Sequence, residues 1–231
     1  MFKQTPMSVT YVDHMGTDLD VVNAARVSFH KESEWSFHPS GVPHSGQKFL
    51  SDNDKKLIKY LSTHNHWSPF SHCTVKFRVK APIFVARQLI KHTVGFSWNE
   101  VSRRYVDSDP EFYFPEGWRG RNKNLKQGSK DDYVHGSDCY MDAAKRYVRH
   151  LDQLYKGMIS GGICPEQARM LLPQNLMTEW IWTGTLYAWA RMCQLRLDSH
   201  TQRETQQIAK DVNKYMTNLF PESWEALMNK E

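Results

Sequence analysis

The chain of 231 residues lacks closely spaced cysteines, long apolar runs and a signal sequence. Its four cysteines form no CxxC pair, which argues against a zinc knuckle and a dense disulfide framework and favours a reducing compartment. No uninterrupted apolar run approaches the roughly 18 residues that span a bilayer, and residues 1–16 contain no apolar signal core. We therefore expect a soluble, cytoplasmic protein with no membrane contact.

Three common functional motifs are also absent. The sequence has no GxxxxGK[ST] loop, no GxGxxG after a strand and no GxSxG elbow, so nucleotide hydrolysis, a Rossmann fold and α/β-hydrolase chemistry have no support. Lys and Arg number 30 against 25 Asp and Glu, which gives a net charge of +5 and a pI near 8.9. This mild excess is compatible with phosphorylated ligands and with nucleic acid, and it does not choose between them.

The hydrophobic periodicity predicts more helix than strand. With 40% hydrophobic residues the chain can bury one substantial core, and we expect a single domain over residues 1–231. Alternation of apolar and polar residues predicts a strand over 72–80. Helices are predicted over 18–29, 51–64, 82–92, 138–162, 165–172, 178–197 and 199–220, with Ser51 or Asp52 and Ser199 as N-caps. The expected fold class is α+β, with long helices packed on a mostly antiparallel sheet and long loops at 30–47 and 107–132.

A dense polar cluster lies in the segment RQLIKHTVGFSWNEVSRRYV, residues 87–106. The helix that starts at Pro82 is expected to lose its regularity near Gly95, so that a loop presents polar side chains to a ligand. These side chains are Ser97, Asn99, Ser102, Arg103 and Arg104. An arginine fork and a serine hydroxyl suit a phosphate group. A solvated basic loop explains the same residues about equally well, because runs of charge usually face water.

Three further groups of residues are open to more than one interpretation. His64, His66 and His72 have no adjacent carboxylate to complete a metal site, so we expect them to contact a ligand or to cap the backbone instead. The aromatic residues Trp180, Trp182, Tyr187 and Trp189 are expected to be mostly core. Arg169 and Arg196 lie in apolar segments, where a charge needs either an acidic partner or an anionic ligand.

Six segments in order along the chain resemble the flavin-dependent thymidylate synthase family. They are AARVSF (24–29), HNHWSPFSH (64–72), FRVKAPIFVARQLIKH (77–92), NEVSRRY (99–105), PEQARMLLP (165–173) and LRLDSHTQRETQQ (195–207). The resemblance implies a homotetramer that binds FAD across subunit interfaces. It also implies an enzyme that converts dUMP to dTMP with methylenetetrahydrofolate as carbon donor, NADPH as reductant and FAD as hydride carrier.

The resemblance also implies roles for individual residues. The catalytic residues would be Arg196, Ser102 and His66, with Arg196 at the uracil ring. The substrate-binding residues would be Gln88, Glu100, Ser102, Arg103, Arg104, Arg169 and Arg196. The cofactor-binding residues would be Ser28, Ser68, Ser71, Lys91, His92, Thr93, Asn99, Arg191 and His200. In this family the flavin carries the redox chemistry, so no cysteine needs to attack the substrate.

The sequence departs from the family signature at one place. The family pattern is Arg-His-Arg, seven residues and a serine, whereas this chain has Lys91-His92-Thr93, eight residues and Ser102. Lysine keeps a charge without the guanidinium fork, and threonine has no charge. Arg191 stands where a smaller polar residue is usual, and it is a candidate to replace one lost cation.

Two rival functions fit part of the sequence. A flavin enzyme could modify C5 of another pyrimidine nucleotide, or transfer a hydroxymethyl group. A non-enzymatic nucleic-acid-binding protein would use the segment 107–130, with basic residues on phosphates and aromatic residues stacked on bases. Its basic residues would be Arg103, Arg104, Arg119, Arg121, Lys123 and Lys126, and its aromatic residues Phe112, Tyr113 and Trp118.

Overall fold

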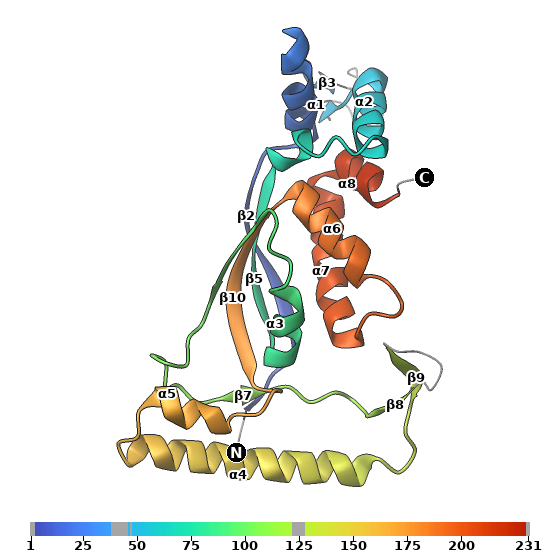
Figure 1. Ribbon diagram of the computed structural model, residues 1–231. Helices are drawn as coiled ribbons and strands as arrows, with labels where there is room; N and C mark the ends of the chain where they lie inside the picture. Colours follow the sequence, from blue (N-terminus) through green and yellow to red (C-terminus); the bar gives the residue numbers. More distant parts are fainter. Residues whose placement is uncertain (1–2, 38–45, 47, 122–127, 230–231) are drawn as a thin grey trace.

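A four-stranded antiparallel sheet forms the centre of the molecule (Figure 1). The computed structural model describes residues 3–37, 46, 48–121 and 128–229. The strands lie in the order β2 (Ser8–Met15), β5 (Thr74–Pro82), β10 (Met177–Thr185) and β6 (Phe96–Glu100). Helices α3 (Ile83–Leu89), α6 (Leu186–Arg196) and α7 (Arg203–Leu219) lie on one side of this sheet. The α+β class with a mostly antiparallel sheet is confirmed.

The core lies between the sheet and these helices because one face of each strand is apolar. In β5 the side chains of Val75, Phe77 and Val79 are fully buried, and the intervening residues are polar. β10 pairs with β5 so that Trp182 lies opposite Phe77 and Trp180 opposite Val79. The predicted strand at 72–80 is confirmed, and so is the assignment of the tryptophans at 180, 182 and 189 to the core.

One end of the molecule contains α1 (Asp18–Arg26), α2 (Asp52–Thr63) and α8 (Pro221–Met228) (Figure 1). A 3₁₀ turn (Val27–Phe29) follows α1, another (Pro69–Ser71) leads into β5, and β3 (Ser36–Phe37) pairs with β4 (Lys48–Phe49). Arg26 on α1 is 2.6 Å from Asp54 on α2. Asp18 accepts the backbone N–H groups of Glu222 and Ser223, so it caps α8 from a distant part of the chain.

The opposite end is built on the long helix α4 (Asp138–Ser160), which lies across the end of the sheet (Figure 1). The short α5 (Pro165–Ala168) and a 3₁₀ turn (Arg169–Leu171) follow it. Four short strands complete this end: β1 (Lys3–Gln4), β7 (Glu111–Phe112), β8 (Arg119–Arg121) and β9 (Ser129–Tyr133). A small second core of Phe112, Phe114, Val148 and Leu176 joins α4 to the rest of the chain.

The predicted helix at 178–197 is wrong in its first half. Residues 177–185 form β10, and α6 begins only at Leu186. Trp180, Trp182 and Gly184 are buried and alternate with less buried residues, so the period is two rather than 3.6. The hydroxyl of Thr185 then accepts the N–H of Ala188 at 3.2 Å and starts the helix.

Several predicted boundaries also need correction. The helix after Pro82 ends at Leu89, well before Gly95, and residues 96–100 form strand β6 instead of a loop. The last long helix begins at Arg203, so Ser199 is not its N-cap. The segment 107–132 contains β7, β8 and most of β9, while 122–127 and most of 38–47 lie outside the described residues. The expectation of a single domain stays a prediction.

Candidate active site

A small pocket lined by basic residues lies between the turn after α3 and helix α6. We call it the cationic pocket; its volume is about 280 Å³. It is lined by Lys91, His92, Thr93, Val94, Phe96, Ala188, Arg191, Leu195 and Arg196. Lys91, Arg191 and Arg196 carry a positive charge and none of the lining residues is acidic, which favours an anionic ligand. The altered signature and Arg191 therefore lie in one pocket.

Gly95 gives the turn beside this pocket its shape. Its φ angle of +78° lies in the left-handed region. A Cβ atom there would be 2.9 Å from the Cβ of Ala188 and 3.0 Å from the hydroxyl of Thr185. Only glycine fits both requirements, so this residue lets the Lys91-His92-Thr93 segment approach α6 closely.

The surroundings of His92 in this pocket change its protonation. Burial lowers its pKa to about 4, and the nearby positive charges of Arg196 and Arg191 add to the effect. The imidazole is therefore neutral at physiological pH. Its Nε2 atom accepts a hydrogen bond of 2.9 Å from Nε of Arg196, which leaves the two terminal nitrogens of Arg196 for a ligand.

A larger cavity of about 830 Å³ lies toward the α4 end of the chain. We call it the large cavity; among the predicted substrate-binding residues it contains Glu100, Arg103 and Arg169. Glu100 accepts hydrogen bonds from Thr178 at 2.7 Å and from the indole of Trp98 at 3.2 Å. Arg169 is exposed, and its Nε donates to the carbonyl of Glu166 at 3.3 Å.

Ser102 and Arg104 form a local pair between β6 and β7. The hydroxyl of Ser102 accepts hydrogen bonds from the backbone N–H and from Nε of Arg104, at 3.3 Å and 3.2 Å. The guanidinium of Arg104 lies 4.9 Å from the ring centre of Tyr105. Within the described part of the chain, neither Arg104 nor Arg169 nor Arg196 is in an ion pair with a carboxylate. The sequence analysis left two explanations for Arg169 and Arg196, an acidic partner or an anionic ligand. Among the described residues, neither arginine has an acidic partner.

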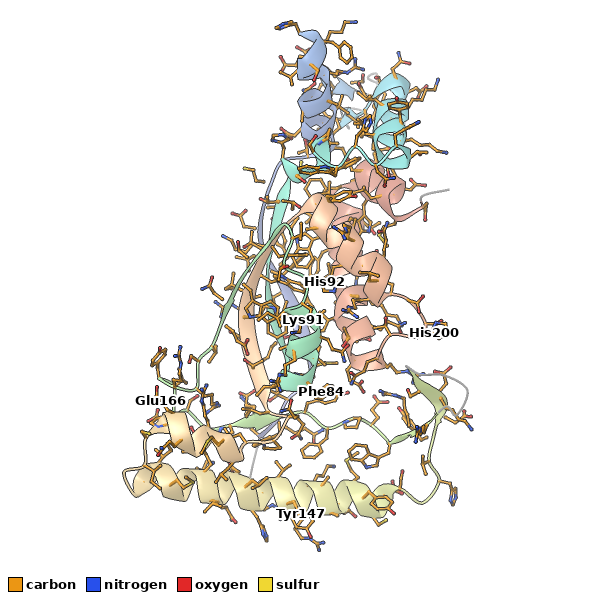
Figure 2. The ribbon with its side chains drawn as sticks, in the orientation of Figure 1. Phe84, Lys91, His92, Tyr147, Glu166 and His200 are labelled. Carbon is orange, nitrogen blue, oxygen red and sulfur yellow. The ribbon has the colours of Figure 1, made fainter. Side chains whose placement is uncertain are left out.

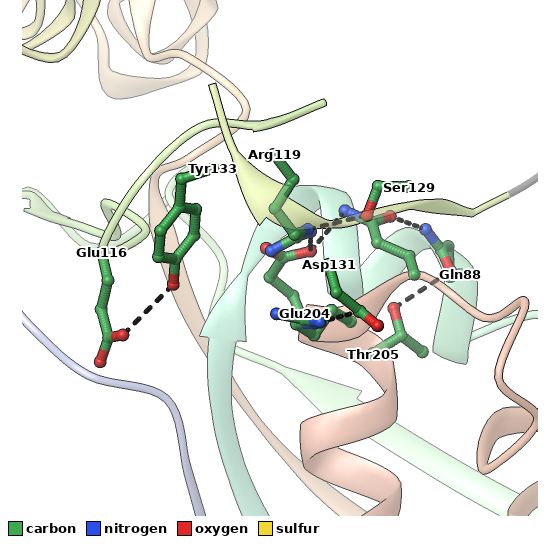
Figure 3. A network of polar contacts seen from close by, with 10 residues as sticks. Gln88, Glu116, Arg119, Ser129, Asp131, Tyr133, Glu204 and Thr205 are labelled. Carbon is green, nitrogen blue, oxygen red and sulfur yellow. Dashed lines mark hydrogen bonds and ion pairs between the residues drawn. The ribbon is translucent and has the colours of Figure 1, made fainter. Parts of the chain in front are cut away.

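Gln88 has a set of protein partners of its own (Figure 3). Its amide nitrogen donates to the side-chain oxygen of Gln202, and its amide oxygen accepts from the hydroxyl of Thr205 at 3.0 Å. Gln202 in turn donates to Glu204 at 3.1 Å, and Glu204 is paired with Arg119 at 2.8 Å. Neither the residue pattern nor the family resemblance predicts a role for Gln202, Glu204 or Thr205, although the segment 195–207 that contains them is one of the six that resemble the family.

The remaining predicted residues lie elsewhere in the chain. Ser28, His66, Ser68 and Ser71 belong to the end formed by α1 and α2, and all except the half-buried Ser71 are exposed. Asn99 is exposed on the edge strand β6. His200 lies in the turn before α7, where its Nδ1 is 2.9 Å from the carboxylate of Asp198.

One chain therefore does not bring all the predicted site residues together. Figure 2 shows Lys91 and His92 midway along the molecule, whereas Glu166 of the large cavity lies at the α4 end. Ser28 and His66 lie in segments at the opposite end. Most of the predicted residues fall into the cationic pocket, the large cavity and the α1–α2 end. The others lie outside all three: Gln88, Asn99, Ser102, Arg104 and His200.

The structure also bears on two other interpretations, a nucleic-acid-binding surface and a metal site. Phe112 is buried, and Arg119 forms its ion pair with Glu204 at side-chain exposures of 15% and 7%, so neither residue is presented to a nucleic acid. Lys123 and Lys126 lie outside the described residues. In the part of the chain that the structure describes, no three His, Cys, Asp or Glu side chains converge to hold a metal ion. No helix in this part is long and apolar enough to cross a bilayer.

Comparison with known proteins gives a consistent family. Residues 10–222 match the family model described as thymidylate synthase complementing protein. The flavin-dependent thymidylate synthase of Kosmotoga olearia is 37% identical over 224 residues, which cover 96% of this chain and 90% of that protein. The Thermotoga neapolitana enzyme of the same name is 35% identical over 221 residues, which cover 95% and 90%.

A solved structure agrees with this result. The UMP/dUMP methylase PolB from Streptomyces cacaoi, bound to 5-Br dUMP, is 28% identical and superimposes with a TM-score of 0.81 over 98% of this chain and 96% of that chain. Matches in sequence and in fold thus extend over nearly the whole chain, and the chain belongs to the flavin-dependent thymidylate synthase family, as its six segments indicated.

Proposed function

We propose that this protein methylates C5 of dUMP to form dTMP, with methylenetetrahydrofolate as carbon donor, NADPH as reductant and FAD as hydride carrier. The observation that carries the proposal is the cationic pocket, in which Lys91, Arg191 and Arg196 surround a neutral His92 without an acidic residue in the lining. Flavin and nucleotide are both anionic ligands, and the pocket has the donors to bind negatively charged groups of either.

The residues of the cationic pocket fit part of a flavin. Its volume of about 280 Å³ is at the low end of sites that enclose a whole small ligand. Lys91, His92 and Arg191 would therefore hold one portion of FAD, and residues such as Ser28, Ser68 and Asn99 would hold the rest. When bound and reduced, FAD supplies the hydride that completes the methyl group.

Arg196 is proposed to stabilise the uracil ring as negative charge develops on it. His92 accepts from Nε of Arg196, so the guanidinium is held with its terminal nitrogens free to donate. A fixed donor aimed at developing charge needs no reorganisation during the reaction. Ser102, Arg104, Gln88 and Arg169 are proposed to bind the sugar and phosphate.

The cysteines support chemistry that needs no protein thiolate. Cys73 and Cys193 are buried, and burial raises the pKa of the Cys73 thiol to about 12 and the pKa of Cys193 as well. Cys139 and Cys164 are exposed, and neither lines the cationic pocket. Activated thiols have lowered pKa values, so the buried pair has the opposite character.

We further propose that the site forms in a homotetramer. Large apolar side chains are exposed directly beside residues of the predicted site in six separate segments. They are Phe29 at 76%, Trp67 at 58%, Val94 at 76%, Tyr105 at 74%, Met170 at 76% and Leu195 at 58%. Contact with another subunit would bury these side chains, and it would bring the three separate groups of site residues together.

An absorbance titration tests the ligands directly. Purified protein is mixed with FAD, and dUMP is then added while the flavin band is recorded. The proposal predicts that FAD binds and that dUMP shifts its band, because both ligands share one site. A protein that takes up no FAD, or whose flavin band ignores dUMP at every concentration, would contradict the proposal.

A second candidate is methylation of UMP or of another pyrimidine nucleotide. PolB is a UMP/dUMP methylase, and its similarity to this chain favours this alternative, as does the changed Lys91-His92-Thr93 signature. Product analysis with dUMP, UMP and dCMP in parallel separates the two. Exclusive turnover of dUMP supports the first proposal, and faster turnover of UMP or dCMP supports the second.

A further inference from the structure

A continuous chain of side-chain hydrogen bonds leads from a buried ion pair to Gln88 (Figure 3). Arg119 donates to Glu204 at 2.8 Å, Gln202 donates to the same carboxylate at 3.1 Å, and Gln88 donates to Gln202. Thr205 completes the set by donating to the amide oxygen of Gln88 at 3.0 Å. The chain thus joins β8, the start of α7 and helix α3, three elements far apart in the sequence.

The direction of each hydrogen bond follows from the two ends of this chain. A guanidinium has only donors, and a carboxylate has only acceptors. Glu204 can therefore receive only the NH₂ group of Gln202, which turns the oxygen of Gln202 toward Gln88. Gln88 must then offer its own NH₂ group to Gln202 and its oxygen to Thr205, as the structure has it.

The direction of these hydrogen bonds matters because an amide group donates through its NH₂ end and accepts through its oxygen. After the bonds to Gln202 and Thr205, Gln88 retains one N–H donor and one lone pair on its oxygen. A flip of the amide would exchange the positions of that donor and that acceptor. A phosphate or a pyrimidine carbonyl needs the donor, so a flipped Gln88 would present the wrong group to it.

Burial limits the access of water to part of this chain. Glu204 is 6% exposed and Thr205 is fully buried, whereas Gln88 and Gln202 are half-buried. Arg119 forms an ion pair with Glu204 at 2.8 Å and so balances its charge. The carboxylate of Glu204 therefore accepts a hydrogen bond from Gln202 and cannot donate one.

We propose that Glu204 is a positioning residue that acts through Gln202 to fix the amide orientation of Gln88 for the nucleotide. The proposal rests on the proposed function, because Gln88 is assigned there to the nucleotide. Glu204 itself lines other cavities and not the cationic pocket, so its influence on the nucleotide is indirect. Thr205 fixes the same amide from its other side.

A double-mutant cycle on dUMP affinity tests this inference. Glu204→Gln keeps the shape of the side chain and removes the fixed acceptor, so Gln202 and Gln88 become free to flip. We expect the dissociation constant of dUMP to rise about tenfold, the worth of roughly one hydrogen bond. In a Gln88→Met background the same substitution is expected to change the dissociation constant by less than about twofold, because the residue it acts through is gone.

Two further variants keep the test decisive. Thr205→Val leaves the Arg119–Glu204 pair intact, so it measures the same orientation effect if Glu204→Gln folds poorly. Glu222→Gln removes the partner of Lys55 in a surface ion pair and should leave dUMP affinity unchanged. KM for dUMP should rise in the Glu204 and Thr205 variants while kcat at saturating dUMP and the content of bound flavin stay near those of the parent.

Each outcome of the cycle is informative. Unchanged dUMP affinity in Glu204→Gln and Thr205→Val, with weaker binding in Gln88→Met, would overturn the positioning role and leave the proposed function intact. An equal loss of affinity with and without Gln88 would also overturn it, since Glu204 would then act by another route. A parent protein that binds no dUMP would instead reject the proposed function, and the nucleotide role of Gln88 with it.

Discussion

At His92, partial burial and two neighbouring guanidinium groups determine the protonation state. Burial disfavours the charged imidazolium, and Arg196 and Arg191 disfavour it further, so the pKa falls to about 4 from the ordinary 6.5. A neutral histidine can accept the hydrogen bond from Arg196, whereas an imidazolium cannot. The orientation of Arg196 thus depends on His92 staying neutral.

This depressed pKa predicts a specific dependence of stability on pH. Between pH 6.5 and pH 4 the unfolded chain binds a proton at His92 and the folded chain does not, so the free energy of unfolding falls as the pH falls through this window. His92→Gln lacks this contribution. We expect the melting temperature of the parent to fall more than that of the variant across the window, as measured by calorimetry; parallel curves would contradict the assignment.

The proposed role of Arg196 predicts that its removal slows the reaction. Arg196→Ala should lower kcat by about 100-fold or more, because removal of one charge-stabilising donor costs that much in well-studied active sites. Absorbance of the purified variant should show that flavin is still bound. Arg149→Ala, at an exposed arginine on α4, is the matched control and should turn over normally. An Arg196→Ala variant of normal activity would remove Arg196 from its proposed role.

At the scale of elements, amphipathic helices and the half-buried strand could be predicted from the sequence, and mixed aromatic segments could not. Helix α2 begins after its predicted cap Ser51, whose hydroxyl accepts the N–H of Asp54, and β5 follows its alternation. β10 was misread because Trp180 and Trp182 precede a helix with similar apolar content. β2, β6 and α8 were missed because their neighbours in space, and not their own patterns, determine their structure.

Gly184 in β10 gives a prediction about the packing of these aromatic residues. A Cβ atom at this position would overlap the ring of Phe96 and lie 3.0 Å from the indole nitrogen of Trp189. Gly184→Ala should therefore lower the free energy of unfolding by about 1 to 3 kcal/mol, as measured by urea denaturation.

A second glycine serves as its control. Gly157 is exposed on helix α4, and a Cβ atom there meets nothing within 4 Å. Gly157→Ala should raise the free energy of unfolding by up to about 1 kcal/mol, because alanine has the higher helix propensity. Equal effects of the two substitutions would mean that Gly184 is not held by close packing.

For the whole molecule, the sequence predicts which residues belong to the site but not how they are arranged in space. Resemblance placed Ser28, His92 and Arg169 in one site, yet the single chain separates the segments that carry them. Sequence patterns report local structure, whereas contacts between subunits depend on the shape of folded surfaces. The hydrogen bonds that link Glu204 through Gln202 to Gln88 could not be predicted from the sequence for a similar reason, because they join α3 to the start of α7 across the fold.

The proposed assembly predicts a particle of four times the chain mass of 27.1 kDa. Phe29 is 76% exposed beside Ser28, so Phe29→Asp should weaken the assembly and reduce bound flavin, because a buried charge in an interface is costly. Light scattering after size-exclusion chromatography measures the mass. Val134→Asp, at a half-exposed residue away from the predicted site, is the control. A monomeric parent that still binds flavin fully would contradict the shared site.

Analysis of the reaction products tests whether the protein uses flavin and folate together to methylate dUMP. Purified protein is incubated with dUMP, methylenetetrahydrofolate and NADPH, with and without FAD, and the nucleotides are separated and weighed by mass spectrometry. We expect dTMP, heavier than dUMP by the replacement of one hydrogen with a methyl group, and only when dUMP, methylenetetrahydrofolate, NADPH and flavin, either bound or added, are all present. Methylation that proceeds equally well after complete removal of flavin, or no change in any pyrimidine nucleotide by protein that has bound FAD, would contradict it.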